Sequence, residues 1–298
     1  NCRHAALFRS LPSALPLVFR RHESERTIRM IFAQISDLHL RADGQKLKKI
    51  INSKKALAAA VSHLKTFKPA PDLVLATGDL VHKGTAKNYR ALRRHLDKLK
   101  LPVYVIPGNH DDRELLRDTF ADWGYLPTEG KFLHYTVEDH PLRLIGLDTV
   151  NPGSDGGMIC TQRLQWLDAR LAEGPGRPTV IFMHHPPFKT GIGFMDRPFF
   201  MGAAAMEAVV RRHPQVERVI CGHVHRPINL GWGGAVATVA PSIAFQISLA
   251  LAPEAPSSSA VEPPALPIFL WRPDTGIIGH MNVIGKFSTI NPAPQHSP

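Results

Sequence analysis

The sequence predicts an α/β fold in which strands and helices alternate along the chain. From Met30 onward, short apolar runs of strand-like composition are separated by longer segments whose leucines recur at helical spacing. The chain has 298 residues, of which 44% are hydrophobic, so it is long enough to bury one large core or two small ones. Alternation of this kind is typical of layered α/β domains.

Six apolar runs are the expected strands, at residues 31–36, 73–77, 103–106, 142–147, 179–183 and 219–221. The helical period is clearest in two of the segments between them, at Leu92, Leu96 and Leu99 and again at Leu164, Leu167 and Leu171. Residues 233–241 and 275–285 predict shorter strands that end in turn residues. We expect these two later strands to form a second sheet.

Three stretches lie outside this pattern. Residues 1–29 hold six arginines against two glutamates and have no helical or strand period, a composition typical of a transit-type leader. The strong strand that starts at Met30 favours another interpretation, an upstream extension that we expect to be disordered. Residues 251–267 contain five prolines and three consecutive serines and predict a loop within a domain of residues 30–285. Residues 286–298 are the expected C-terminal tail.

Charge and cysteine content limit the function classes. The net charge of +11 is spread along the chain without a dense basic block, so anionic substrates are compatible and a nucleic-acid partner is not expected. Cys2, Cys160 and Cys221 form no pairing pattern, which favours a reducing, cytoplasmic location. No apolar run reaches the roughly 20 residues that cross a bilayer, so no membrane segment is expected.

Metal-ligand side chains follow five of the expected strands. In open α/β sheets the binding crevice lies beyond the carboxyl ends of the strands, so we expect these side chains to converge. A glycine directly precedes a proposed ligand at Gly78, Gly108 and Gly222, where the backbone must approach closely. The side chains are Asp37 and His39, Asp79, Asn109 to Asp112, His184 and His185, and His223 and His225.

The chemistry of this set indicates a metal centre. Carboxylates, imidazoles and one amide, without a thiolate, suit iron, manganese, zinc or cobalt better than Cu(I) or an all-oxygen calcium site. The ligand positions are too many for one tetrahedral ion and suit two ions that share a carboxylate. Each motif alone also fits a turn or a cap, so the indication comes from all five occurring in order.

The other histidines receive no catalytic role, although His82, three residues after Asp79, is close enough in sequence to approach a substrate. Cys221 is expected to be a small buried residue. The histidines outside the set include His63, His82, His95, His134, His140, His213 and His280.

The motifs DLH, GD, GNHD, HHPP and GHVH, in that order, resemble the calcineurin-like metallophosphoesterase superfamily. The chain is most similar to the bacterial branch of class III cyclic-nucleotide phosphodiesterases and glycerophosphodiesterases, from Met30 to about Ala240. The resemblance implies a four-layer α/β/β/α sandwich. Glycerophosphodiesterase-like members form oligomers with a substrate-covering C-terminal element. Because residues 251–267 do not align with that element, a homo-oligomer and the choice of leaving group stay open.

The resemblance also implies roles for individual residues. One ion would be held by Asp37, His39, Asp79 and His225, and the other by Asp79, Asn109, His184 and His223. Asp79 would bridge the ions, and His110 would lie near the scissile phosphate. His185, Asp111 and Asp112 would support the ligands, with one of the acids as the cap of the helix that begins at Arg113.

The implied activity is a metal-dependent phosphodiesterase for small diesters, either 3′,5′-cyclic nucleotides such as cAMP or glycerophosphodiesters. A dinuclear centre would supply a metal-bound hydroxide. His110 would protonate the leaving alkoxide or hold a phosphoryl oxygen. One alternative is a nuclease of the same superfamily, favoured only by the net charge. Another is a non-catalytic scaffold, which the complete ligand set disfavours.

Overall fold

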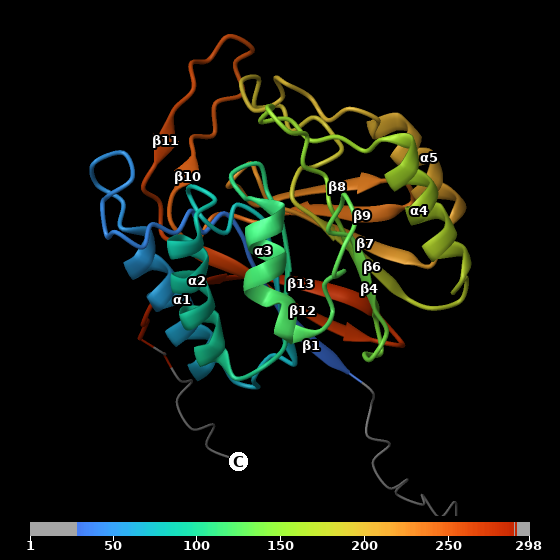
Figure 1. Ribbon diagram of the computed structural model, residues 1–298, viewed down its shortest axis with the longest axis horizontal. Helices are drawn as coiled ribbons and strands as arrows, with labels where there is room; N and C mark the ends of the chain where they lie inside the picture. The colour runs from blue at the N-terminus through green and yellow to red at the C-terminus, as the bar shows by residue number, and fades with distance from the viewer. Residues whose placement is uncertain (1–28, 289, 291–298) are drawn as a thin grey trace, which may run out of the picture.

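A computed structural model of the chain describes residues 29–288 and residue 290. The expected N-terminal extension therefore lies outside the described residues except for Arg29, and so does the end of the expected C-terminal tail. Within the described part, strands and helices alternate as the sequence predicts (Figure 1).

The first sheet has the strand order β13-β12-β1-β2-β3. β1, β2 and β3 run parallel, and β12 lies antiparallel to β1. Every residue of β1, β2 and β3 is buried, which explains their nearly continuous apolar sequences. The bounds are β1 Met30–Ile35, β2 Leu73–Thr77, β3 Val103–Ile106, β12 Ala265–Arg272 and β13 Gly276–Val283.

The second sheet has the order β4-β5-β6-β7-β9-β8. β5, β6, β7 and β9 are parallel, and an antiparallel strand closes each edge. A two-stranded hairpin, β10 with β11, stands apart from both sheets. The bounds are β4 Tyr135–Val137, β5 Arg143–Leu147, β6 Thr179–Met183, β7 Val216–Cys221, β8 Ile228–Trp232, β9 Ala235–Val239, β10 Gln246–Ile247 and β11 Ser259–Ala260.

The helices lie in two groups, one along each sheet (Figure 1). α1 (Ser53–Thr66), α2 (Ala86–Leu96) and α3 (Arg113–Phe120) accompany the first sheet, and α4 (Thr161–Ala172) and α5 (Ala203–Arg212) the second. Side chains from both sheets belong to one continuous hydrophobic core. This arrangement confirms the expected α/β/β/α sandwich.

Short 3₁₀ turns at Asp97–Leu99 and Ala121–Trp123 follow α2 and α3. No helix in the described residues is long and apolar enough to cross a membrane.

Two expectations about the C-terminal third were wrong. Residues 233–241 and 275–285 do not share a sheet, because β9 joins the second sheet and β13 returns to the first. Residues 251–267 are not wholly a loop, since they contain β11 and the start of β12. Pro267 is tolerated in β12 because the pairing with β1 begins only at Ile268, so its missing N–H interrupts no bond to β1.

Candidate metal centre

The loops after β1, β2, β3, β6 and β7 meet at the edge where the carboxyl ends of both sheets come together. The backbone there is unusual, because several non-glycine residues adopt the left-handed conformation, which costs free energy and is concentrated at functional sites. These residues turn the chain sharply at the strand ends and direct their side chains toward one another. They include Asp37 (φ 54°), His39 (41°), Asp79 (49°), His223 (71°) and His225 (53°).

Four of the predicted ligands form a tight first group. His39 Nε2 and His225 Nε2 are 3.2 Å apart, and His225 Nε2 lies 3.2 Å from Asp37 Oδ1. Asp79 Oδ2 is 3.5 Å from His39 Nε2. All four side chains are buried. Ligands bound about 2.1 Å from one ion are separated from each other by roughly 3 to 3.4 Å, so these spacings fit a shared cation.

The second group shares Asp79 through its other oxygen. Asp79 Oδ1 lies 3.4 Å from His184 Nε2, which is 3.2 Å from Asn109 Oδ1. His223 approaches this group less closely, with its ring centroid 5.2 Å from that of His184. Its backbone N–H donates to both carboxylate oxygens of Asp37 at 3.1 Å. The two oxygens of Asp79 therefore face two different ligand groups, the geometry that a bridging carboxylate needs.

Hydrogen bonds to backbone carbonyls set the tautomers of three histidines. Nδ1–H of His184 donates to Thr77 O at 2.8 Å, that of His225 to Phe245 O at 2.9 Å, and that of His110 to His82 O at 3.0 Å. A carbonyl only accepts, so in the neutral ring Nδ1 carries the proton and Nε2 keeps its lone pair. Such contacts orient metal-binding histidines in general, and the residues present therefore fit a metal.

The two buried acids and the neighbouring histidines shift one another's pKa values. Burial would raise the pKa of Asp37, but the charge and hydrogen bond of His225 lower it to about 2. Burial would also raise the pKa of Asp79, but the charge and hydrogen bond of His184 lower it well below its usual value. Burial lowers the pKa of His184, but Asp79 outweighs it and raises this pKa to about 9. Without a cation, a proton on His184 compensates Asp79, and binding a cation would replace that proton.

Close backbone approach explains the three glycines that precede ligands. A Cβ added to Gly78 would lie 2.5 Å from His184 Nδ1, and one on Gly108 would lie 2.2 Å from Asp79 Oδ1. A Cβ on Gly222 would meet Ser36 Oγ at 2.0 Å. Gly78 also has a φ of 84°, which disfavours any side chain. The glycines are therefore required for the ligands to pack.

The acids after His110 support the turn, as the sequence predicts. Asp111 accepts from the backbone N–H of Gly108 and Leu80 at 2.9 and 3.0 Å, and burial raises its pKa to about 6. Asp112 caps α3 by accepting from Leu115 N at 2.9 Å.

The second histidine of the HHPP motif contacts a hydroxyl group: His185 Nδ1 lies 2.9 Å from Thr149 Oγ1. Cys221 is buried.

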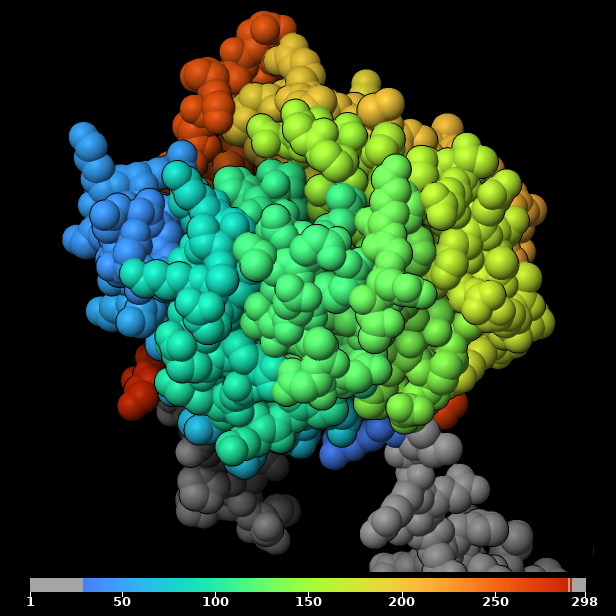
Figure 2. Space-filling view, in the orientation of Figure 1, coloured from blue at the N-terminus to red at the C-terminus, as the bar shows by residue number. Residues whose placement is uncertain are grey.

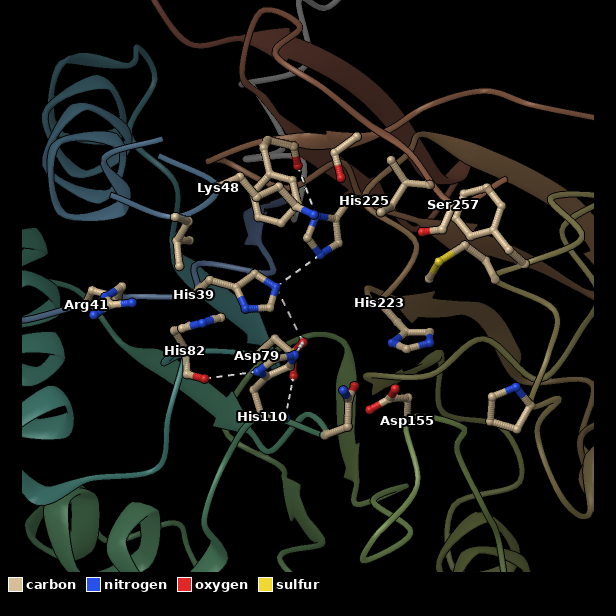
Figure 3. Close-up of a pocket in the computed structure, with 18 of the residues that line it drawn as sticks. His39, Arg41, Lys48, Asp79, His82, His110, Asp155, His223, His225 and Ser257 are labelled. Atoms are coloured by element: carbon tan, nitrogen blue, oxygen red, sulfur yellow. Dashed lines mark hydrogen bonds and ion pairs between the residues drawn. The ribbon is translucent and has the colours of Figure 1, made fainter. Parts of the chain in front are cut away.

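A cavity of about 600 Å³ lies over the two ligand groups (Figure 3). His110 borders it, with Nε2 3.9 Å from Asp79 Oδ2. His82 borders it too, and its ring stacks on that of His110 at 5.4 Å. Sequence reasoning gave His82 no role, and its only signal was its position three residues after Asp79. The walls also carry the cations Arg41, Lys46, Lys48 and Arg197 and the apolar side chains Phe194, Met195 and Phe245.

Known proteins are similar to this chain in sequence and in fold. The model of the calcineurin-like phosphoesterase family matches residues 30–227. The probable glycerophosphodiester phosphodiesterase GpdQ of Arcobacter nitrofigilis is 35% identical over 259 residues, which cover 87% of this chain and 94% of the relative. The 3′,5′-cyclic adenosine monophosphate phosphodiesterase CpdA of Escherichia coli K12 is 27% identical over 218 residues, covering 73% and 78%.

Among solved structures, a dimetal phosphatase from Danio rerio is similar with a TM-score of 0.54 and 17% identity, covering 86% of this chain and 99% of that one. At this identity the likeness shows the fold alone. The family match includes the loops after β1, β2, β3, β6 and β7, which carry the metal-ligand motifs. The chain belongs to the calcineurin-like phosphoesterase family.

Proposed function

We propose that this chain is a metal-dependent phosphodiesterase that hydrolyses small phosphodiesters, either 3′,5′-cyclic nucleotides such as cAMP or glycerophosphodiesters. The observation that carries the proposal is Asp79, whose two oxygens face two ligand groups beneath one cavity. A cavity of about 600 Å³ is in the range that holds small ligands. The relatives named above act, by their names, on diesters of these two kinds.

The ligand assignment follows the two groups. Asp37, His39, Asp79 and His225 would hold one ion, and Asp79, Asn109, His184 and His223 the other. A donor set without thiolate suits iron, manganese, zinc or cobalt. When bound, two such ions would supply Lewis-acid activation of water and stabilise charge on the phosphoryl group. Asn109 adds a neutral oxygen, which limits the negative charge that an anionic diester must approach.

His110 is the residue we propose for contact with the reacting phosphate. Its Nδ1–H bond to His82 O directs Nε2 toward the cavity, and its backbone N–H donates to Asp79 Oδ1 at 2.9 Å. The imidazole is therefore held next to the bridging acid. In its protonated form Nε2 would donate to the leaving oxygen or to a phosphoryl oxygen. His82 supports this position through its carbonyl and its stacked ring.

We further propose residues 30–285 as one catalytic domain, supported by the hydrophobic core that both sheets share. A cytoplasmic location, suggested by the cysteine pattern, belongs to the same proposal, and Cys160 and Cys221 are free in the structure. The complete ligand set argues against a non-catalytic scaffold. Metal analysis after preparation with abundant Mn²⁺ and Zn²⁺ would favour the scaffold if the site stayed empty.

A substrate panel tests the proposal directly. The protein is purified, loaded with Mn²⁺ or iron, and assayed with bis(p-nitrophenyl) phosphate, p-nitrophenyl phosphate, cAMP and glycerophosphocholine. We expect turnover of diesters in preference to the monoester, loss of activity with a chelator and recovery on adding metal. Absence of metal-dependent diester turnover would refute the proposal. Salt-sensitive DNA cleavage would instead support the nuclease alternative.

A further inference from the structure

One wall of the cavity carries positive charge that the metal centre does not use. Lys46 and Lys48 line the cavity, and both belong to the segment between β1 and α1. We define residues 46–51 as the lysine turn. Figures 1 and 2 show the blue segment that precedes α1 standing out at the edge of the molecule. Within residues 46–55 there are five lysines and no acidic residue.

The lysine turn has a fixed shape. Lys48 and Lys49 both adopt the left-handed conformation, with φ of 46° and 66°. Three backbone bonds close the turn, from Leu47 N to Ile51 O at 2.8 Å and from Ile50 N and Ile51 N to Leu47 O at 3.1 and 2.9 Å. Two consecutive non-glycine residues in this conformation are costly, so the surrounding contacts must hold them there.

A small hydrophobic cluster anchors the turn beside the metal centre. Leu47 and Ile51 are buried against Phe245, separately from the main core. Phe245 in turn lies with its ring centroid 4.6 Å from that of His225 and 5.6 Å from that of His39. The anchor turns Leu47 inward and leaves its neighbours Lys46 and Lys48 exposed along the cavity.

The two ammonium groups have no acidic partner in the described residues. The ion pair formed in this part of the chain is between Arg41 and Asp43, at 2.8 Å, and neither lysine takes part in it. Lys48 Nζ lies 5.9 Å from the Phe245 centroid, and the same ring lies next to the ligands His39 and His225. Asp155 lies on the opposite side of the cavity (Figure 3). A second anionic group, beyond the reacting phosphate, would fit the lysine side.

We propose that the lysine turn is a specificity element that selects diesters whose alcohol carries a further anionic group, such as a carboxylate. The inference rests on the proposed function for the identity of the reaction. The metal ions would neutralise the phosphodiester, and Lys46 and Lys48 would pair with the second anion beside Phe245. The substrate class is therefore a phosphodiester whose alcohol carries a carboxylate or another anionic group in addition to the phosphate.

The test uses ligand pairs that differ only in one carboxylate. O-phosphoserine and O-phosphoethanolamine are titrated into Mn²⁺-loaded protein by calorimetry, and glycerophosphoserine and glycerophosphoethanolamine are compared as substrates. We expect tighter binding of O-phosphoserine and a higher kcat/KM for glycerophosphoserine, each by about five- to tenfold, because each partly exposed ion pair contributes modestly. In Lys46→Gln/Lys48→Gln the preference should disappear, while the values for the two ethanolamine compounds stay within about twofold.

A matched variant separates local pairing from bulk charge. Lys54→Gln/Lys55→Gln removes the same charge from exposed positions in the first turn of α1 that do not line the cavity. This variant should keep the wild-type preference. The inference is overturned if the wild type binds both monoesters equally, if the control loses the preference, or if the lysine-turn variant weakens both members of each pair alike. Because calorimetry needs no turnover, a protein that discriminates the monoesters but hydrolyses no diester would refute the proposed function and leave the lysine turn supported.

Discussion

The two sheets contribute different chemistry to the site. Among the proposed ligands, loops of the first sheet carry both carboxylates, the amide and one histidine, whereas loops of the second sheet carry the histidines His184, His223 and His225. Each proposed ion takes ligands from both sheets. The comparison teaches that neither sheet holds a complete set of proposed ligands, and that histidines of the second sheet help to compensate the buried acids of the first.

Contacts across this junction are close on both sides. Gly78 of the first sheet lies under the ring of His184, and Gly222 of the second lies against Ser36 and Asp37. A hydrogen bond also crosses the junction, since the side-chain Nε2 of Gln34 donates to Cys221 O at 2.8 Å. The geometry of the site therefore depends on how the sheets pack, and the predictions that follow disturb this junction in order of decreasing effect.

Asp79→Ala should have the largest effect, because Asp79 is the side chain that both groups share. We expect loss of both ions and of measurable turnover, since two groups of histidines would then face each other without a shared anion. Elemental analysis by mass spectrometry, together with the bis(p-nitrophenyl) phosphate assay, checks this. Asp43→Ala, which removes an exposed acid paired with Arg41, is the control. Full activity in Asp79→Ala would contradict the bridging assignment.

His110→Ala should separate chemistry from metal binding. The side chain borders the cavity and is not in either proposed ligand group, so both ions should remain while kcat falls by about 10² to 10⁴. Metal content and steady-state kinetics are measured on the same preparation. Substitution of His213, which contacts Asp168 at 2.7 Å away from the cavity, should leave kcat unchanged. Loss of metal in His110→Ala would place this residue among the ligands instead.

Gly222→Ala tests the junction itself. Its Cβ would lie 2.0 Å from Ser36 Oγ and 2.8 Å from Asp37 Oδ2, so the sheets or the ligand must shift. We expect a loss of about 1–3 kcal/mol in the free energy of unfolding and metal affinity weakened by about 10- to 100-fold. Gly231→Ala is the matched control in the same sheet, because an added Cβ there meets nothing within 4 Å. Equal effects in the two variants would show that the junction is not what positions Asp37.

The pH dependence of metal binding should be the smallest effect. Burial lowers the pKa of His184, but Asp79 raises it to about 9, so the metal-free site holds a proton at pH 7. A cation must displace that proton, and affinity should therefore rise about tenfold per pH unit up to about pH 9 and then level off. Calorimetry in buffers of different ionisation enthalpy would count about one proton released per chain at pH 7. No released proton would contradict the Asp79–His184 pairing.

The sequence predicts the proposed metal ligands better than the residues that line the cavity around them. Parallel strands buried on both faces leave apolar runs, and the ligands follow them directly, so Asp37, Asp79 and His184 could be placed at strand ends. β12 was missed because prolines on both sides of Ala265 obscured it. β13 was assigned to the wrong sheet because its connection to β1 through β12 spans most of the chain. Such long-range pairing leaves no local signal.

The same limit applies to the backbone groups and side chains that surround the ligands. The carbonyls of Thr77, His82 and Phe245 that set histidine tautomers carry no sequence signature, because any residue has a carbonyl. His82 and the lysine turn enter the cavity only through the path of the backbone. For Lys48 that path depends on a left-handed conformation that lysine rarely adopts. These features required the three-dimensional structure.

The most direct test of the account is the position of bound metal. A crystal of the protein grown with Mn²⁺ and measured for anomalous scattering should show two peaks, one on each side of Asp79, with the second in contact with Asn109 and His184. A single peak, or two peaks that do not share Asp79, would contradict the claim that the two sheets build one dinuclear site.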